Sequence, residues 1–125
     1  MKYLIIHPSS SAPLDKNILA SQGYNYIFNK DGSVTELEKP DYDVVYNLDT
    51  LPGLAMHVIY DGDGYGDDRT YKQYDTMEIF VKYHALINPK LKIAGIYQIK
   101  ETEDPGFEVP KWLKDIGIQN NSYDG

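Results

Sequence analysis

The sequence has no cysteine among its 125 residues, so it can form neither a disulfide bond nor a cysteine-ligated metal site. Basic residues are also few, because 12 lysines and arginines stand against 19 aspartates and glutamates, for a formal net charge of −7. Nucleic-acid binding and docking on anionic lipid both require a basic surface. We therefore expect neither a nucleic-acid partner nor a membrane partner.

Long apolar runs are absent as well. The run at the N-terminus covers only Tyr3 to Ile6, whereas a signal peptide has an apolar region of about 7–15 residues and a membrane span has about 20. We expect no signal peptide and no transmembrane helix. The apolar content of 42% is typical of globular proteins, so residues 1–125 are expected to form one domain.

The pattern of apolar and turn-forming residues predicts a mixed α/β fold, with a β-sheet flanked by helices. Before residue 61 we expect a buried strand over 3–6, one or two helical turns within 14–22, a hairpin over 24–37 that turns at 30–33, and strands at 42–46 and 55–60. The strand at 55–60 is almost entirely apolar, which favours a central place in the sheet.

After residue 61 the sequence predicts a polar glycine-rich loop over 61–68 and a long helix from its N-cap at Thr70 to about Leu86. A strand over 91–99, a loop over 100–107 and a short helix within 108–115 follow. The loop at 61–68 has aspartates at alternate positions, like a calcium loop. Its twelfth position is Lys72, where an EF-hand needs glutamate, so a solvated turn is the favoured interpretation.

Three histidines are candidates for chemistry, because imidazole is a frequent catalytic group and metal ligand. His84 lies on the apolar stripe of the long helix and His57 lies inside a strand, so packing roles are favoured for both. His7 stands where a strand ends in a loop, a position at which functional groups are often mounted. His7 is therefore the preferred candidate from position alone.

Six segments, in order, carry a resemblance to one known family. They are Ile5-Ile6-His7-Pro8-Ser9-Ser10, the hairpin Gly23 to Val34, His57 to Gly62, the helix from Thr70 to His84 with Gln73 in register, Ala94-Gly95-Ile96, and Asp104-Pro105-Gly106-Phe107. Together they resemble the N-acetylmuramoyl-L-alanine amidases, which include phage lysozyme-type amidases and peptidoglycan recognition proteins. The resemblance covers residues 3–115 and implies a peptidoglycan-amidase-like mixed sheet.

In that family two histidines and one cysteine or aspartate hold a zinc ion. The resemblance places His7 at the first ligand and Asp104 at the third. Ile96 stands at the second, where it offers no lone pair. Tyr24 matches a catalytic-site tyrosine, and Thr102 replaces a lysine.

The resemblance therefore implies a degenerate amidase with an incomplete zinc site, whose partner is a peptidoglycan fragment or a protein. His57, Tyr97 and Thr102 are further candidates for binding. The alternative is an active zinc amidase that cleaves the bond between muramic acid and L-alanine, with His57 or Tyr97 completing the metal site. The same resemblance, with no signal peptide, suggests a cytoplasmic protein or one encoded by a phage or mobile element.

Overall fold

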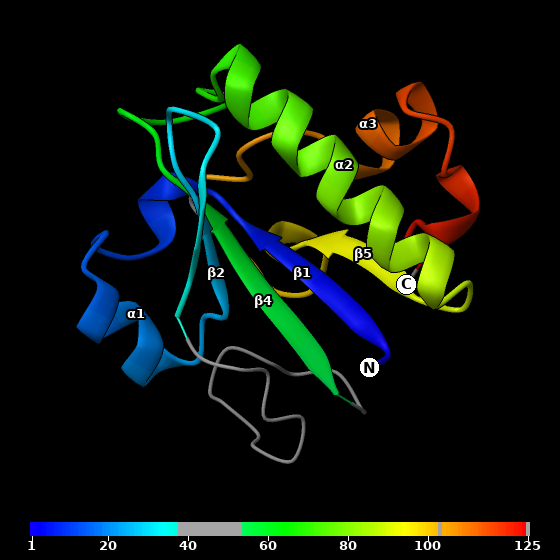
Figure 1. Ribbon diagram of the computed structural model, residues 1–125, viewed down its shortest axis with the longest axis horizontal. Helices are drawn as coiled ribbons and strands as arrows, with labels where there is room; N and C mark the ends of the chain where they lie inside the picture. Colours follow the sequence, from blue (N-terminus) through cyan, green and yellow to red (C-terminus); the bar gives the residue numbers. More distant parts are fainter. Residues whose placement is uncertain (38–53, 103, 125) are drawn as a thin grey trace.

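The fold is built around one five-stranded sheet, with strand order β3-β2-β4-β1-β5 (Figure 1). The computed structural model describes residues 1–37, 54–102 and 104–124, and the strand expected at 42–46 lies outside them. The strands are β1 (Tyr3–His7), β2 (Tyr26–Phe28), β3 (Val34–Glu36), β4 (Ala55–Tyr60) and β5 (Lys92–Gly95). All neighbouring strands are parallel except the β2–β3 hairpin, which confirms the predicted mixed sheet, with β4 at its centre.

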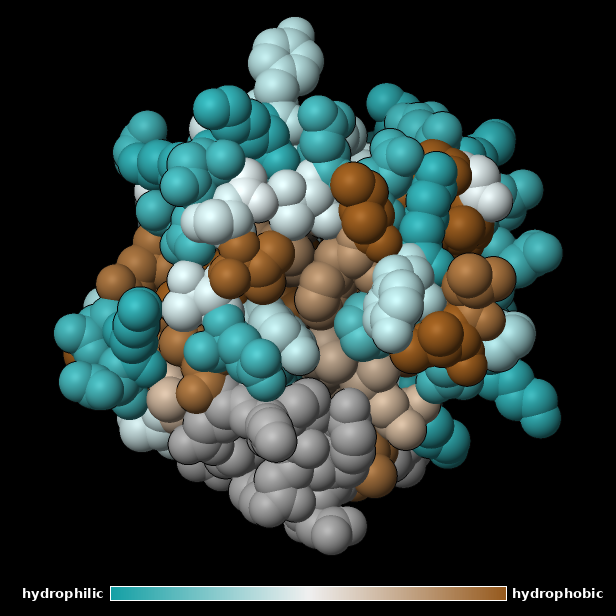
Figure 2. Space-filling model, in the orientation of Figure 1, coloured by the Kyte–Doolittle hydropathy of each residue, from teal (hydrophilic) through white to brown (hydrophobic). Residues whose placement is uncertain are grey.

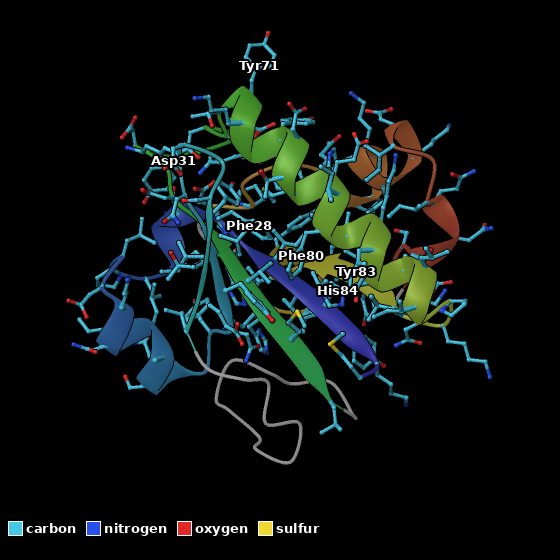
Figure 3. The ribbon with its side chains drawn as sticks, in the orientation of Figure 1. Phe28, Asp31, Tyr71, Phe80, Tyr83 and His84 are labelled. Carbon is cyan, nitrogen blue, oxygen red and sulfur yellow. The ribbon has the colours of Figure 1, made fainter. Side chains whose placement is uncertain are left out.

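One face of the sheet is covered by α2 (Tyr71–Ile87) and α3 (Val109–Asp115), and α2 lies across the front of the sheet in Figure 1. Phe28 of β2 and Phe80 of α2 meet there, with ring centres 5.0 Å apart (Figure 3). The buried cluster on this face contains Leu4, Ile6, Phe28, Met56, Val58, Tyr60, Met77, Val81, Leu91, Ile93, Phe107, Val109, Trp112 and Leu113. This cluster is the main core of the domain.

The opposite face of the sheet carries α1 (Lys16–Gln22), which packs through Leu19. The side chain of Asp15 caps the start of α1, and Gly23 ends it in the left-handed region with φ of 98°. Because side chains alternate along a strand, every second residue of β1 and β4 points to this α1 face. Ile5 and His7 of β1 lie on it, as does His57 of β4, which pairs with Ile5.

The long helix begins as predicted. Thr70 and Gln73 form a capping box, in which each side chain binds the backbone of the other residue. The predicted strand over 91–99 is wrong in length. β5 ends at Gly95, and residues Ile96–Gln98 form a 3-10 turn, η2. The side-chain oxygen of Gln98 accepts a hydrogen bond from the Gly95 backbone N–H, which closes the turn.

The outer surface of α2 leaves several apolar side chains exposed among polar ones. Ile79, Tyr83, Leu86 and Ile87 are all more than half exposed, and brown patches mark this region in Figure 2. Tyr71, at the start of α2, points away from the protein (Figure 3). Within the described residues, no helix combines the length and apolar character that a membrane crossing requires.

Candidate functional site

A pocket of about 250 Å³ opens on the α1 face of the sheet, beyond the carboxyl ends of β1 and β5. Ligands of open α/β sheets commonly bind at this edge, because the loops that follow the strands converge there. Its described lining residues come from four segments and are His7, Ser10, Ser11, Tyr24, Tyr65, Ile96, Lys100, Thr102 and Asp104. The structure therefore brings together His7, Tyr24, Ile96, Thr102 and Asp104, all of which the sequence had singled out.

His7 is fully enclosed, and both of its ring nitrogens have partners. Its Nε2 lies 2.9 Å from Nδ1 of His57, and its Nδ1 lies 3.4 Å from the hydroxyl of Tyr24. Burial holds the pKa of His7 well below its ordinary value, and the neighbouring charges of His57 and Lys100 lower it further. His7 is therefore neutral at pH 7, and it links β1 to β4 through side chains as well as through the sheet.

Tyr24 follows α1 and packs edge-on against the His7 ring, with ring centres 4.8 Å apart. Burial raises the pKa of Tyr24 to about 12, so its hydroxyl keeps its proton at neutral pH. A protonated hydroxyl can donate to His7 or turn toward a ligand in the pocket. Tyr24 is thus a hydrogen-bonding group of the pocket wall.

Asp104 is held by three donors. Its Oδ1 accepts from the backbone N–H groups of Gly106 and Gly66, at 2.9 and 3.1 Å, and its Oδ2 accepts from the hydroxyl of Ser10 at 2.8 Å. Burial alone would raise the pKa of Asp104, but these bonds outweigh it and hold the pKa below its ordinary value. The carboxylate therefore joins three loops, those after β1, after β4 and before α3.

The donor set of this pocket does not fit a catalytic zinc ion, which takes three protein ligands and an open fourth position. Both oxygens of Asp104 and both ring nitrogens of His7 already have hydrogen-bond partners. Ile96 is buried at the pocket wall and supplies no donor atom. In the described ranges, no group of three His, Cys, Asp or Glu side chains is placed to hold a metal ion.

The other residues named from the sequence lie around the pocket. Thr102 lines it, and its hydroxyl donates to the backbone oxygen of Asp104 at 3.3 Å. His57 lies behind His7 and is buried, outside the described pocket lining. Tyr97 also lies outside that lining, and its hydroxyl accepts from the Val109 backbone N–H at 3.1 Å. Burial raises the pKa of Tyr97, and the negative charge of Glu108 raises it further. The hydrogen bond from Val109 lowers this pKa, but by less.

Sequence reasoning did not assign Lys100, Ser11 or Tyr65 to the site. All three line the pocket. Lys100 stands two residues before Thr102 and follows the 3-10 turn at Ile96–Gln98, which comes directly after β5. The only signal in the sequence was that Lys100 lies close to position 102, where the resemblance places a lysine. Lys100 itself is out of register with that position.

Comparison with solved structures shows what this arrangement is similar to. The amidase LysC from Clostridium intestinale URNW, an N-acetylmuramoyl-L-alanine amidase, superposes with a TM-score of 0.72 at 15% identity, over 94% of this chain and 85% of that one. The Ph2119 endolysin, from a bacteriophage of Thermus scotoductus MAT2119, gives a TM-score of 0.63 at 15% identity over 97% and 84% of the two chains.

Drosophila PGRP-LB gives a TM-score of 0.57 at 16% identity, over 98% of this chain and 85% of that one. No protein-family model matches the sequence, and no curated protein matches it significantly. The similarity therefore lies in the arrangement of the elements, and it spans nearly the whole chain. This protein has the fold of the N-acetylmuramoyl-L-alanine amidases and of PGRP-LB.

Proposed function

We propose that this protein binds a fragment of peptidoglycan in the pocket at the ends of β1 and β5 and does not hydrolyse it. The observation that carries the proposal is the donor set. The pocket stands on a fold shared with proteins named as amidases, an endolysin and a PGRP. Its His7 and Asp104 have other hydrogen-bond partners, and Ile96 fills the position that the family resemblance gives to the second ligand.

The remaining groups of the pocket suit a ligand that carries amides and a carboxylate. Ser11, Tyr65 and Thr102 offer hydroxyl groups, and Lys100 offers an ammonium group. Within the described part of the chain, no carboxylate lies within ion-pair distance of Lys100. An ammonium group with no carboxylate partner among the described residues is suited to a ligand carboxylate, and peptide stems of cell-wall fragments carry both amides and carboxylates.

The test combines binding and turnover in one sample. N-acetylmuramoyl-L-alanyl-D-isoglutamine is titrated into the protein in a calorimeter, and the mixture is then analysed for free N-acetylmuramic acid and free dipeptide. We expect saturable binding and unchanged ligand. Lys100→Gln should weaken binding about tenfold through the loss of one charge-assisted contact. Lys90→Gln is the matched control, because this exposed lysine precedes β5 at the other end of the sheet.

Other results would assign a different function. Release of the dipeptide, with zinc retained by the purified protein, would establish an active amidase and overturn the proposal. The absence of any binding would also overturn it, and would direct attention to a protein partner, tested by isolating complexes from a cell lysate. Equal binding by Lys100→Gln and the parent would show that the ligand does not use this pocket.

A further inference from the structure

A second pocket of about 250 Å³ lies between the start of α2 and α3, on the other side of the segment that contains Asp104. It shares no described lining residue with the first pocket. Its lining residues are Asp67, Arg69, Tyr74, Gly106, Phe107, Glu108, Lys111, Trp112 and Asp115. The volume is slightly below the range of about 300–1,000 Å³ typical of sites for drug-sized ligands, and suits a ligand of roughly one ring.

Arg69 is the central group of this second pocket. Its side chain is only 1% exposed, and its Nε and Nη2 donate to the two carboxylate oxygens of Asp67, at 2.8 and 3.0 Å. The guanidinium carbon lies 3.3 Å from the ring centre of Phe107 and 4.0 Å from that of Tyr74. The charge of Arg69 is therefore balanced by Asp67 and by two aromatic faces.

Two buried N–H donors in this pocket have no acceptor among the described residues. They are Nη1 of Arg69 and Nε1 of Trp112, and the guanidinium carbon lies 5.3 Å from the Trp112 ring centre. A buried donor without an acceptor costs about 1–3 kcal/mol, and folded proteins rarely leave such groups unmatched. These two donors stay unmatched among the described residues, and an oxygen acceptor bound in the pocket would satisfy them.

The charges around the pocket decide what kind of acceptor it takes. Arg69 and Lys111 supply two positive charges, whereas Asp67, Glu108 and Asp115 supply three negative charges. An excess of negative charge disfavours a carboxylate or phosphate and favours a neutral amide carbonyl. The aromatic walls suit a methyl group or the apolar face of a ring. Glu108 and Asp115 are exposed and can accept hydrogen bonds from hydroxyl groups.

We propose that the second pocket binds an N-acetylhexosamine through its acetamido group. One molecule then supplies a neutral carbonyl for the two unmatched donors, a methyl group for the aromatic wall and hydroxyl groups for the exposed carboxylates. Both nitrogens are covered in this structure, so side chains of the pocket wall must move for the carbonyl to reach them. This inference does not rest on the function proposed for the first pocket.

The experiment uses the fact that Trp112 is the only tryptophan in the chain. The uniformly ¹⁵N-labelled protein has a single indole N–H resonance, which reports directly on one of the two unmatched donors. Triacetylchitotriose is titrated in at up to millimolar concentration, with cellotriose as a control that has the same hydroxyl-rich rings and no acetamido group. We expect a saturable downfield shift of the indole proton with triacetylchitotriose and none with cellotriose.

A variant then tests the contact itself. Trp112→Phe keeps an aromatic ring and removes the donor, so its affinity, measured by calorimetry, should fall about three- to tenfold. Lys114→Ala is the control on the same helix, because Lys114 is exposed and lies outside the pocket lining. An indole resonance that does not move with triacetylchitotriose overturns the proposal, as does an equal shift with cellotriose. The wild-type titration decides the matter even if Trp112→Phe is unstable.

Discussion

Replacement of Asp104 tests whether this carboxylate stabilises the fold by joining loops or serves as a metal ligand. In Asp104→Ala the backbone N–H groups of Gly66 and Gly106 lose their acceptor, while the exposed Ser10 hydroxyl can turn to water. At about 1.5 kcal/mol for each lost bond to a charged acceptor, the free energy of unfolding should fall by about 3 kcal/mol. Asp104→Asn keeps a neutral acceptor for both N–H groups and should cost about 1 kcal/mol.

The assay is urea unfolding followed by the fluorescence of Trp112, which is buried and is the only tryptophan. In a thermal scan of a chain of this length about 1 kcal/mol corresponds to roughly 4 °C, so the melting temperature should fall by about 12 °C in the alanine variant and about 4 °C in the asparagine variant. Asp75→Ala, at an exposed position of α2, is the control and should stay within about 0.5 kcal/mol of the parent.

Two results would refute this reasoning about Asp104. Asp104→Ala could unfold within about 0.5 kcal/mol of the parent, which would mean that the three bonds contribute nothing net. Alternatively, a chelator could lower the melting temperature of the parent and have no effect on Asp104→Asn. That pattern would assign the carboxylate to a metal ion, because only a bound metal makes stability depend on chelation.

Three further predictions concern the same scaffold. The pKa of His7 is depressed in the folded state, so the unfolded state binds more protons below pH 6.5. The contribution of His7 to the free energy of unfolding should therefore be fully present above that pH. It should fall by up to about 1.4 kcal/mol per pH unit below it. Urea unfolding of the parent and His7→Gln across this range measures the contribution, and equal slopes would contradict it. Gln73 is fully buried and donates to the backbone oxygens of Phe28 and Asp61. In urea unfolding, Gln73→Met should therefore lower the free energy of unfolding by about 2–4 kcal/mol. The control Lys72→Met, at an exposed position, should lower it by less than about 0.5 kcal/mol. Ile96→His should retain about one zinc per chain after desalting, by elemental analysis, whereas the parent should retain none; zinc in neither protein would show that position 96 does not correspond to a ligand.

The elements that the sequence predicted well are those whose determinants are close together in the chain. The helix beginning after Thr70 depends on a capping box with Gln73, three residues away. The β2–β3 hairpin depends on the turn at residues 30–33 between two short alternating strands. Local hydrogen bonds and local periodicity are visible without knowledge of the fold.

The end of β5 was missed because its cause is not visible in the hydrophobic pattern. Apart from Gln98, the residues from Gly95 to Ile99 are apolar or aromatic, as they would be in a longer strand. The strand nevertheless stops, because Gln98 captures the Gly95 N–H and Ile96 is buried from a 3-10 turn instead. A side-chain bond competed with the sheet for one backbone donor, and hydrophobic patterns do not record that competition.

The contact between His7 and His57 could not be read from the sequence for a different reason. It requires the register of two parallel strands fifty positions apart, in which His57 pairs with Ile5. The surroundings of Arg69 are similar, since its aromatic neighbours come from α2, from the loop at Phe107 and from α3. Such sites arise from the packing of distant segments, which depends on long-range pairing and not on local residue preference.

The place of β1 in the sheet also determines when the protein can fold during its synthesis. β1 is the first strand made, yet its partners start at Ala55 and Lys92. At about 5–20 residues per second, roughly 4–18 s separate the translation of β1 from that of β5. During that interval the apolar residues of β1 have only part of their final surroundings. The nascent chain therefore exposes an unpaired apolar strand for seconds. Such a chain is a natural client for chaperones that bind apolar segments before a sheet is complete.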